Sequence, residues 1–278
     1  MPIEQPIVFD VGDDAVVGVL HQSEHTARTG VVIIVGGPQY RIGSHRQFLI
    51  LARDLCAGGF DVLRFDYRGM GDSAGDARTF EDIEGDIRAA VDEIYRRRPS
   101  LRHVLLLGLC DGATAALLYA PSDQRIRSLV MINPWARSNA SHAQVTLRSY
   151  YLRRLLSPTF WRKLVHRQVA VRQSIADAAQ TARAAHAADD RPPYLTLLDE
   201  AARTYCGPLL LILSGNDLTA DEFASWASGD AARAAAFRRE SVQRVSIAVA
   251  NHTFSSASLR VTLSDRILAF CREQTLRT

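Results

Sequence analysis

The chain has 278 residues, of which 47% are hydrophobic and 23% are charged, a composition typical of a soluble globular protein. This length is enough to bury a full core in one large domain, or in a domain that carries an insertion. Because the net charge is only +3 and no apolar run is long enough to span a bilayer, we expect neither a nucleic-acid partner nor stable insertion into a membrane.

The first half of the chain alternates strands with helices. Residues 5–22 predict a hairpin, with Val11-Gly12-Asp13-Asp14 as its turn. Apolar, largely β-branched runs then predict buried strands at residues 31–35, 61–66, 104–109 and 128–133. Helices are predicted at residues 44–57 and 79–97, and a further helix begins after residue 110. This alternation predicts βαβ crossovers and a mostly parallel sheet.

The alternation stops between about residues 134 and 205, where no strand is predicted. Amphipathic helical patterns rich in arginine, an alanine-rich stretch and a break at residues 189–193 predict a helical insertion, although the arginines also fit an ordinary solvated face. Strands at residues 208–214 and 242–249 and helices at residues 220–238 and 255–274 follow. We therefore expect an α/β core of residues 1–134 and 206–278, with an eight-stranded sheet between helices, and a helical cap of residues 135–205.

One stretch between a predicted strand and a predicted helix has the pattern of a nucleophile elbow. Gly108-Leu109-Cys110-Asp111-Gly112 follows an apolar run and precedes small residues. At such a turn the strand and the helix approach closely, so glycines avoid a clash and the residue between them is strained and exposed. The N-terminus of the following helix favours a thiolate at Cys110. The alternative is a buried cysteine that packs as a small hydrophobic residue.

A cysteine nucleophile needs a base and a group that orients the base. His252 directly follows the last predicted strand, at the carboxyl edge of the sheet, where Cys110 must also lie and where ligands bind in open α/β sheets. Asp217 follows the preceding strand and is the first choice for the orienting acid. Asp221, the second choice, also fits the first turn of the next helix, where a carboxylate is favourable in any case.

With its nucleophile, acid and histidine in this order, the chain resembles the α/β-hydrolase superfamily over nearly its whole length. The elbow, the loop of residues 66–73, the turn of residues 215–217 and His252 all fall where that superfamily has them. More narrowly, VGGPQYRIGSHR (residues 35–46), RFDYRGMGDS (residues 64–73) and the cysteine elbow resemble the exosortase A system-associated hydrolase 1 family. This resemblance implies a bacterial gene set for exopolysaccharide production and protein sorting, with no defined substrate.

Two positions depart from the pattern of the superfamily. Cysteine replaces serine at the elbow, as in dienelactone hydrolase-like members, and a cysteine nucleophile passes through a thioester. In the loop that supplies the oxyanion hole, Pro38 has no N–H group, so the N–H of Gln39 must serve as a donor beside that of Asp111. Asn133 stands where some members have their acid, which supports the later position of the acid.

The loop of residues 66–73 is rich in turn formers. Gly69 and Gly71 are expected to shape a turn, while Asp66 and Arg68 hold neighbouring loops together by charge-assisted hydrogen bonds. We expect a structural role for this loop rather than a catalytic one.

The other cysteines and the N-terminal residues indicate in which cellular compartment the protein is expected. Cys56, Cys206 and Cys271 form no C-x-x-C or zinc spacing with Cys110, so we expect reduced thiols and no metal. The first residues lack a basic region followed by an apolar one, so no signal peptide is expected. Both observations favour a cytoplasmic protein.

These residues together predict an enzyme that hydrolyses an ester or thioester of a small molecule without a metal or organic cofactor. Cys110 is the expected nucleophile, His252 the base and Asp217 the orienting acid. One alternative is acyl transfer to a sugar hydroxyl, and another is a binding module that keeps the fold without efficient chemistry. The oligomeric state stays open, with a homodimer as one alternative.

Overall fold

A computed structural model describes residues 3–137 and 192–276 of the chain. Eight strands form one sheet in the order β1-β2-β4-β3-β5-β6-β7-β8. The strands are β1 (Ile3–Val11), β2 (Asp14–Gln22), β3 (Thr29–Ile34), β4 (Asp61–Phe65), β5 (His103–Leu109), β6 (Ile126–Ile132), β7 (Leu209–Asn216) and β8 (Val242–Asn251). β2 pairs antiparallel with β1 and β4, and the other neighbours are parallel. The predicted mostly parallel sheet of eight strands is confirmed.

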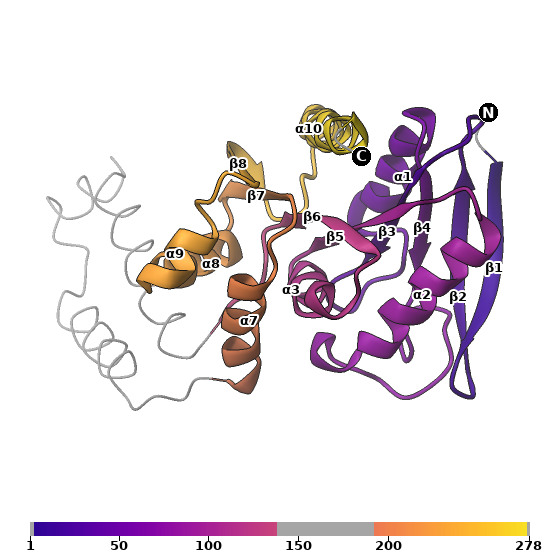
Figure 1. The fold of residues 1–278 in the computed structure, drawn as a ribbon, viewed down its shortest axis with the longest axis horizontal. Coiled ribbons are helices and arrows are strands. Elements are labelled where there is room, and N and C mark those ends of the chain that lie inside the picture. The colour runs from indigo at the N-terminus through magenta and orange to yellow at the C-terminus, as the bar shows by residue number, and fades with distance from the viewer. Residues whose placement is uncertain (1–2, 138–191, 277–278) are drawn as a thin grey trace, which may run out of the picture.

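Helices cover both faces of the sheet (Figure 1). On one face α1 (Gln47–Ala57) contacts α10 (Ala257–Leu276). The helices of the other face are α2 (Glu84–Arg97), α3 (Asp111–Tyr119), α7 (Pro193–Thr204), α8 (Leu218–Ser228) and α9 (Ala231–Ala236). Within the described residues, no helix combines the length and the apolar character needed to cross a membrane.

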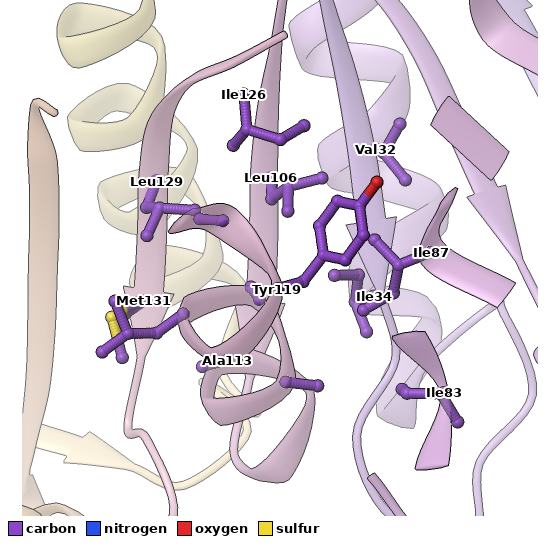
Figure 2. Close-up of a cluster of buried hydrophobic side chains, with 14 of the residues drawn as sticks. Val32, Ile34, Ile83, Ile87, Leu106, Ala113, Tyr119, Ile126, Leu129 and Met131 are labelled. Atoms are coloured by element: carbon purple, nitrogen blue, oxygen red, sulfur yellow. The ribbon is translucent and has the colours of Figure 1, made fainter. Parts of the chain in front are cut away.

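Alternate residues of the central strands pack on opposite faces of the sheet, as the two-residue period of a strand requires. In β3, Val32 and Ile34 join the hydrophobic cluster under α2 and α3, whereas Val31 and Ile33 join the cluster under α1 and α10. Figure 2 shows part of the first cluster, where side chains of β3, β5 and β6 face α2 and α3. Burial on both faces explains why the sequence of these strands is continuously apolar instead of alternating.

Three predicted helix boundaries are wrong, each for a local reason. Residues Ser44–Arg46 form a 3₁₀ turn in which His45 has a left-handed φ of 53°, so α1 begins only at Gln47. Another 3₁₀ turn, Phe80–Asp82, delays the start of α2. The helix predicted at residues 220–238 is two helices, because the Asp230 side chain accepts the N–H groups of Ala232 and Arg233 and starts α9 anew. The spacing of hydrophobic residues does not reveal such 3₁₀ turns and caps.

The predicted cap lies largely outside the described residues, which stop at Arg137 and resume at Pro192. α7 falls inside the predicted cap boundaries and packs against α3. Its Leu198 is fully buried in the same cluster as the residues of the sheet. The described end of this segment thus contributes to the core, and a helical cap of residues 135–205 stays a prediction.

Candidate active site

Cys110 lies between the end of β5 and the start of α3, at the carboxyl edge of the sheet. Its φ of 58° is in the left-handed region, which is unfavourable for a residue with a side chain. The Cys110 carbonyl accepts N–H groups of Ala113 at 3.1 Å and of Trp135 at 3.2 Å, which ties the turn to α3 and to the chain after β6. The thiol is half-buried. The strained turn predicted from the elbow sequence is therefore present.

The glycines of the elbow are required by close backbone approach. A Cβ on Gly108 would lie 2.4 Å from the nitrogen of Ala113, and a Cβ on Gly112 would lie 2.5 Å from the carbonyl oxygen of Ile34. In the loop after β3, a Cβ on Gly36 would lie 2.3 Å from the carbonyl oxygen of Leu109. The ends of β3 and β5 and the start of α3 thus meet without room for a side chain.

The structure brings Asp217 and His252 together beside this turn. Asp217 directly follows β7 and His252 directly follows β8, so the parallel pairing of these strands carries both residues to one edge. His252 Nδ1 lies 2.7 Å from Asp217 Oδ2. The other carboxylate oxygen, Oδ1, accepts the N–H of Thr219 at 3.2 Å and caps α8. The first turn of α8 thereby fixes the Asp217 carboxylate, which in turn orients the His252 ring.

The Cys110 side chain lies close enough to His252 to raise the pKa of the ring. Burial lowers the pKa of His252, but the hydrogen bond and charge of Asp217, together with the neighbouring Cys110, outweigh it and raise the pKa to about 10. The ring is therefore protonated at neutral pH.

Asp221, the second choice for the acid, lies in the first turn of α8. Its N–H donates to the carbonyl of Asp217 at 3.2 Å. Across the described ranges, Asp217 is the carboxylate that contacts the His252 ring. In the same ranges, no group of three or more His, Cys, Asp or Glu side chains is arranged to hold a metal ion.

The side chain of Asp111 fastens the loop after β3 to the elbow. Its Oδ1 accepts the N–H of Gly37 at 2.6 Å and the N–H of Gly112 at 3.0 Å. Burial raises the pKa of Asp111, while these two N–H groups oppose the rise. The sequence predicts a role only for the backbone N–H of Asp111, because its side-chain partner is 74 positions away along the chain.

The sequence predicts that the backbone N–H of Gln39 binds an oxyanion, but in the structure this N–H already has an acceptor. That N–H donates to the Gly37 carbonyl at 2.8 Å, in a tight turn around Pro38. The Gln39 side chain closes the same loop, since Oε1 accepts the N–H and the hydroxyl of Ser44 at 3.0 Å each and Nε2 donates to the Gly36 carbonyl at 3.1 Å. Gln39 therefore determines the shape of the loop through its side chain.

Asn133 is a site residue whose role was missed at the level of sequence. It is fully buried after β6, with a left-handed φ of 44°. Its Nδ2 donates to Ser214 Oγ at 2.9 Å and to the His252 carbonyl at 3.0 Å, and its Oδ1 accepts the Ser214 N–H at 2.8 Å. Asparagine tolerates left-handed backbone better than most residues, and its place at the end of a predicted strand was the available signal.

The loop of residues 66–73 has the structural role expected of it. Gly69 and Gly71 have left-handed φ values of 73° and 55°. Asp66 accepts the backbone N–H and the guanidinium of Arg41, which anchors the loop after β3. The Arg68 guanidinium donates to both oxygens of Asp86 in α2.

Comparison with known families finds one match that spans most of the chain. Residues 26–252 match the model of the family described as serine aminopeptidase, S33. No curated protein sequence matches this chain.

Solved structures of esterases and related hydrolases have a similar fold. The esterase Pf2001 of Pyrococcus furiosus covers 98% of this chain and 91% of its own, with a TM-score of 0.67 and 15% identity. Est1E of Butyrivibrio proteoclasticus, solved with ferulic acid, covers 97% of this chain and 99% of its own, with a TM-score of 0.64 and 14% identity. The dienelactone hydrolase of Anabaena variabilis covers 98% of both chains, with a TM-score of 0.62 and 16% identity. At these identities the likeness establishes the fold.

Proposed function

The chain belongs to the serine aminopeptidase S33 family of the α/β-hydrolase superfamily, and from this premise we propose that it hydrolyses carboxylic esters or thioesters with Cys110 as nucleophile. The observation that carries the proposal is the 2.7 Å contact between His252 Nδ1 and Asp217 Oδ2 beside Cys110. The raised pKa of His252 and the strained backbone of Cys110 support it, since both are typical of activated nucleophiles.

In the first half of the proposed reaction, the Cys110 thiolate attacks the carbonyl carbon of the substrate. A carbon–sulfur bond forms, and the carbonyl oxygen takes the negative charge. When this intermediate collapses, the leaving alcohol or thiol takes its proton from the His252 imidazolium, and a thioester to Cys110 remains. Asp217 keeps the proton on Nδ1, so the other ring nitrogen is the one that transfers a proton.

In the second half, neutral His252 accepts a proton from water, which attacks the thioester. The carbon–sulfur bond then breaks, the carboxylic acid leaves and loses its remaining proton to solvent, and the thiolate and imidazolium are restored. The His252 side chain is 32% exposed, which gives water a route to the ring. This exposure favours hydrolysis over acyl transfer to a sugar hydroxyl. Acyl transfer and the link to exopolysaccharide production both stay predictions from the sequence.

The proposed oxyanion hole contains two backbone donors. The N–H of Asp111 belongs to the first turn of α3, where backbone N–H groups have no partner within the helix. The N–H of Gln39 becomes the second donor when a substrate oxygen replaces the Gly37 carbonyl as its acceptor. One such donor contributes about 3 kcal/mol to stabilisation of the transition state. The rate of hydrolysis therefore depends strongly on whether the Gln39 N–H leaves the Gly37 carbonyl for the substrate oxygen.

The test of the nucleophile is intact-mass measurement after rapid mixing with p-nitrophenyl acetate. The unchanged chain should gain the mass of one acetyl group, and Cys110→Ala should gain none and lose hydrolysis. Cys206→Ala is the matched control, because that cysteine is exposed and distant in the fold, and it should acylate normally. In His252→Ala the adduct should form far more slowly. Full hydrolysis by Cys110→Ala would contradict the proposal.

A further inference from the structure

The opposite edge of the same strands carries a hollow that the proposed reaction does not use. A crevice of about 700 Å³ opens where β3, β5, β6 and β7 begin. Thr29 and His103 are the first residues of β3 and β5, and Arg127 and Ser128 belong to the start of β6. Since the proposed catalytic residues follow the ends of strands, this crevice lies at the amino edge of the sheet.

Several polar side chains that line this crevice have no partner within the described part of the chain. Six of its lining residues make no side-chain hydrogen bond or ion pair within residues 3–137 and 192–276: Thr29, His103, Gln124, Arg127, Ser128 and Gln274. Ser128 is only 2% exposed and Thr29 only 6% exposed. Both hydroxyls still reach the crevice, where they can bond water or a ligand.

The two charged side chains of the crevice differ in whether they are paired. Its lining includes one carboxylate, Asp123, which already accepts the Tyr119 hydroxyl at 2.6 Å and the Arg125 guanidinium at 2.7 Å. The guanidinium of Arg127 has no such partner in the described part of the chain. Burial, together with the charges of Arg127 and Arg102, lowers the pKa of His103. An anion beside Arg127 would meet an unneutralised cation and several free hydrogen-bond donors.

We propose that this amino-edge crevice binds a small hydroxylated anion, with Arg127 contacting the phosphate or carboxylate group. Thr29, Ser128 and Gln274 contact the hydroxyl groups of the ligand. A volume of about 700 Å³ is in the range of pockets that enclose small molecules, and it suits a sugar phosphate or a sugar acid. This site is separate from Cys110 and does not depend on the proposed hydrolysis.

Calorimetric titration of the full chain tests the proposal with four probes: glucose 6-phosphate, gluconate, inorganic phosphate and glucose. Glucose 6-phosphate or gluconate should bind, and neutral glucose should not. A comparison of glucose 6-phosphate with gluconate distinguishes a phosphate site from a carboxylate site. Inorganic phosphate shows how much of the affinity comes from the anionic group alone. Arg127→Gln should weaken binding at least about tenfold, the loss expected for one charge-assisted hydrogen bond. If no anionic probe binds, the proposal is wrong.

Arg238→Gln is the matched control, because Arg238 is exposed and lies outside the crevice. It should bind the anion as the unchanged chain does. Equal loss in both variants would show attraction by net charge instead of a site, and would overturn the proposal.

Cys206 provides an independent readout, because this exposed thiol lies in the wall of the crevice. Bound anion should slow alkylation of Cys206 by iodoacetamide, followed by peptide mass, while Cys110 is alkylated at its usual rate. Arg127→Gln should lose this protection. Protection of Cys110 without protection of Cys206 would place the anion at the other edge and contradict the proposal.

Discussion

The two edges of the parallel strands differ in how their polar groups are satisfied. At the carboxyl edge, polar side chains bond one another or nearby backbone: Asp217 with His252, Asn133 with Ser214. At the amino edge, the side chains of Thr29, Arg127 and Ser128 lack protein partners in the described ranges. The same strands build both edges, so the difference comes from the loops. Internal bonding preorganises one edge for chemistry, whereas side chains that face solvent leave the other edge able to bind a ligand.

The largest effect is expected from a substitution that breaks the hydrogen bond between Asp217 and His252. Asp217→Asn should lower kcat by about 10⁴-fold, because an amide at this position favours the wrong tautomer of the ring. Steady-state hydrolysis of p-nitrophenyl acetate measures it. Asp221→Asn is the matched control, since Asp221 lies one turn further along α8, and it should keep nearly full activity. Equal losses in both variants would remove Asp217 from its proposed role.

The next effect tests the side chain that joins the oxyanion loop to the elbow. Asp111→Ala removes the acceptor for the N–H groups of Gly37 and Gly112. We expect kcat to fall about 10²-fold, with KM changed far less, because the loop loses its position at the transition state. Asp111→Asn keeps an acceptor oxygen and should restore much of the rate. If Asn is as poor as Ala, the negative charge is what matters and the positioning role is wrong.

A third change tests the close packing of the carboxyl edge by stability instead of rate. Gly36→Ala would place a Cβ 2.2 Å from Asp111 Oδ1 and should lower the free energy of unfolding by about 3 kcal/mol. Urea denaturation measures this loss. In Gly12→Ala the new Cβ has nothing within 4 Å, although φ is +63°. That control should therefore lose only about 1 kcal/mol. Similar losses would show that crowding at Gly36 is unimportant.

The pH dependence tests the charge of His252. Its pKa is about 10 in the folded chain against 6.5 ordinarily, so protonation stabilises the fold fully below pH 6.5 and this contribution disappears as pH rises towards 10. The difference in urea midpoint between the unchanged chain and His252→Gln should shrink over that range. Hydrolysis should also fall near pH 10, because the imidazolium no longer protonates the leaving group. A constant difference would mean that the ring is neutral.

The smallest expected effect lies at the other edge. Arg127→Gln removes the free cation of the amino-edge crevice, far from the reacting atoms, so the rate of hydrolysis without added anion should stay the same. The same assay with p-nitrophenyl acetate measures it. A change in kcat would show that the two edges are coupled through the strands between them.

Local sequence patterns alone predicted most of the architecture. Continuous apolar runs mark strands buried on both faces, and the spacing of Gly108, Cys110 and Gly112 marks a turn whose geometry depends on residues close in sequence. Cys110, Asp217 and His252 each directly follow a predicted strand, and because parallel strands share a carboxyl edge, these positions predicted that the three residues lie close together.

Only the tertiary structure decided which partner each polar group takes. The N–H of Gln39 bonds Gly37, the Asp111 carboxylate bonds a loop 74 residues away, and Asn133 holds the backbone of His252. The amino-edge crevice likewise arises where the starts of four strands meet. Such contacts join segments distant along the chain, so their partners follow from how helices and loops pack, which no local period in the sequence encodes.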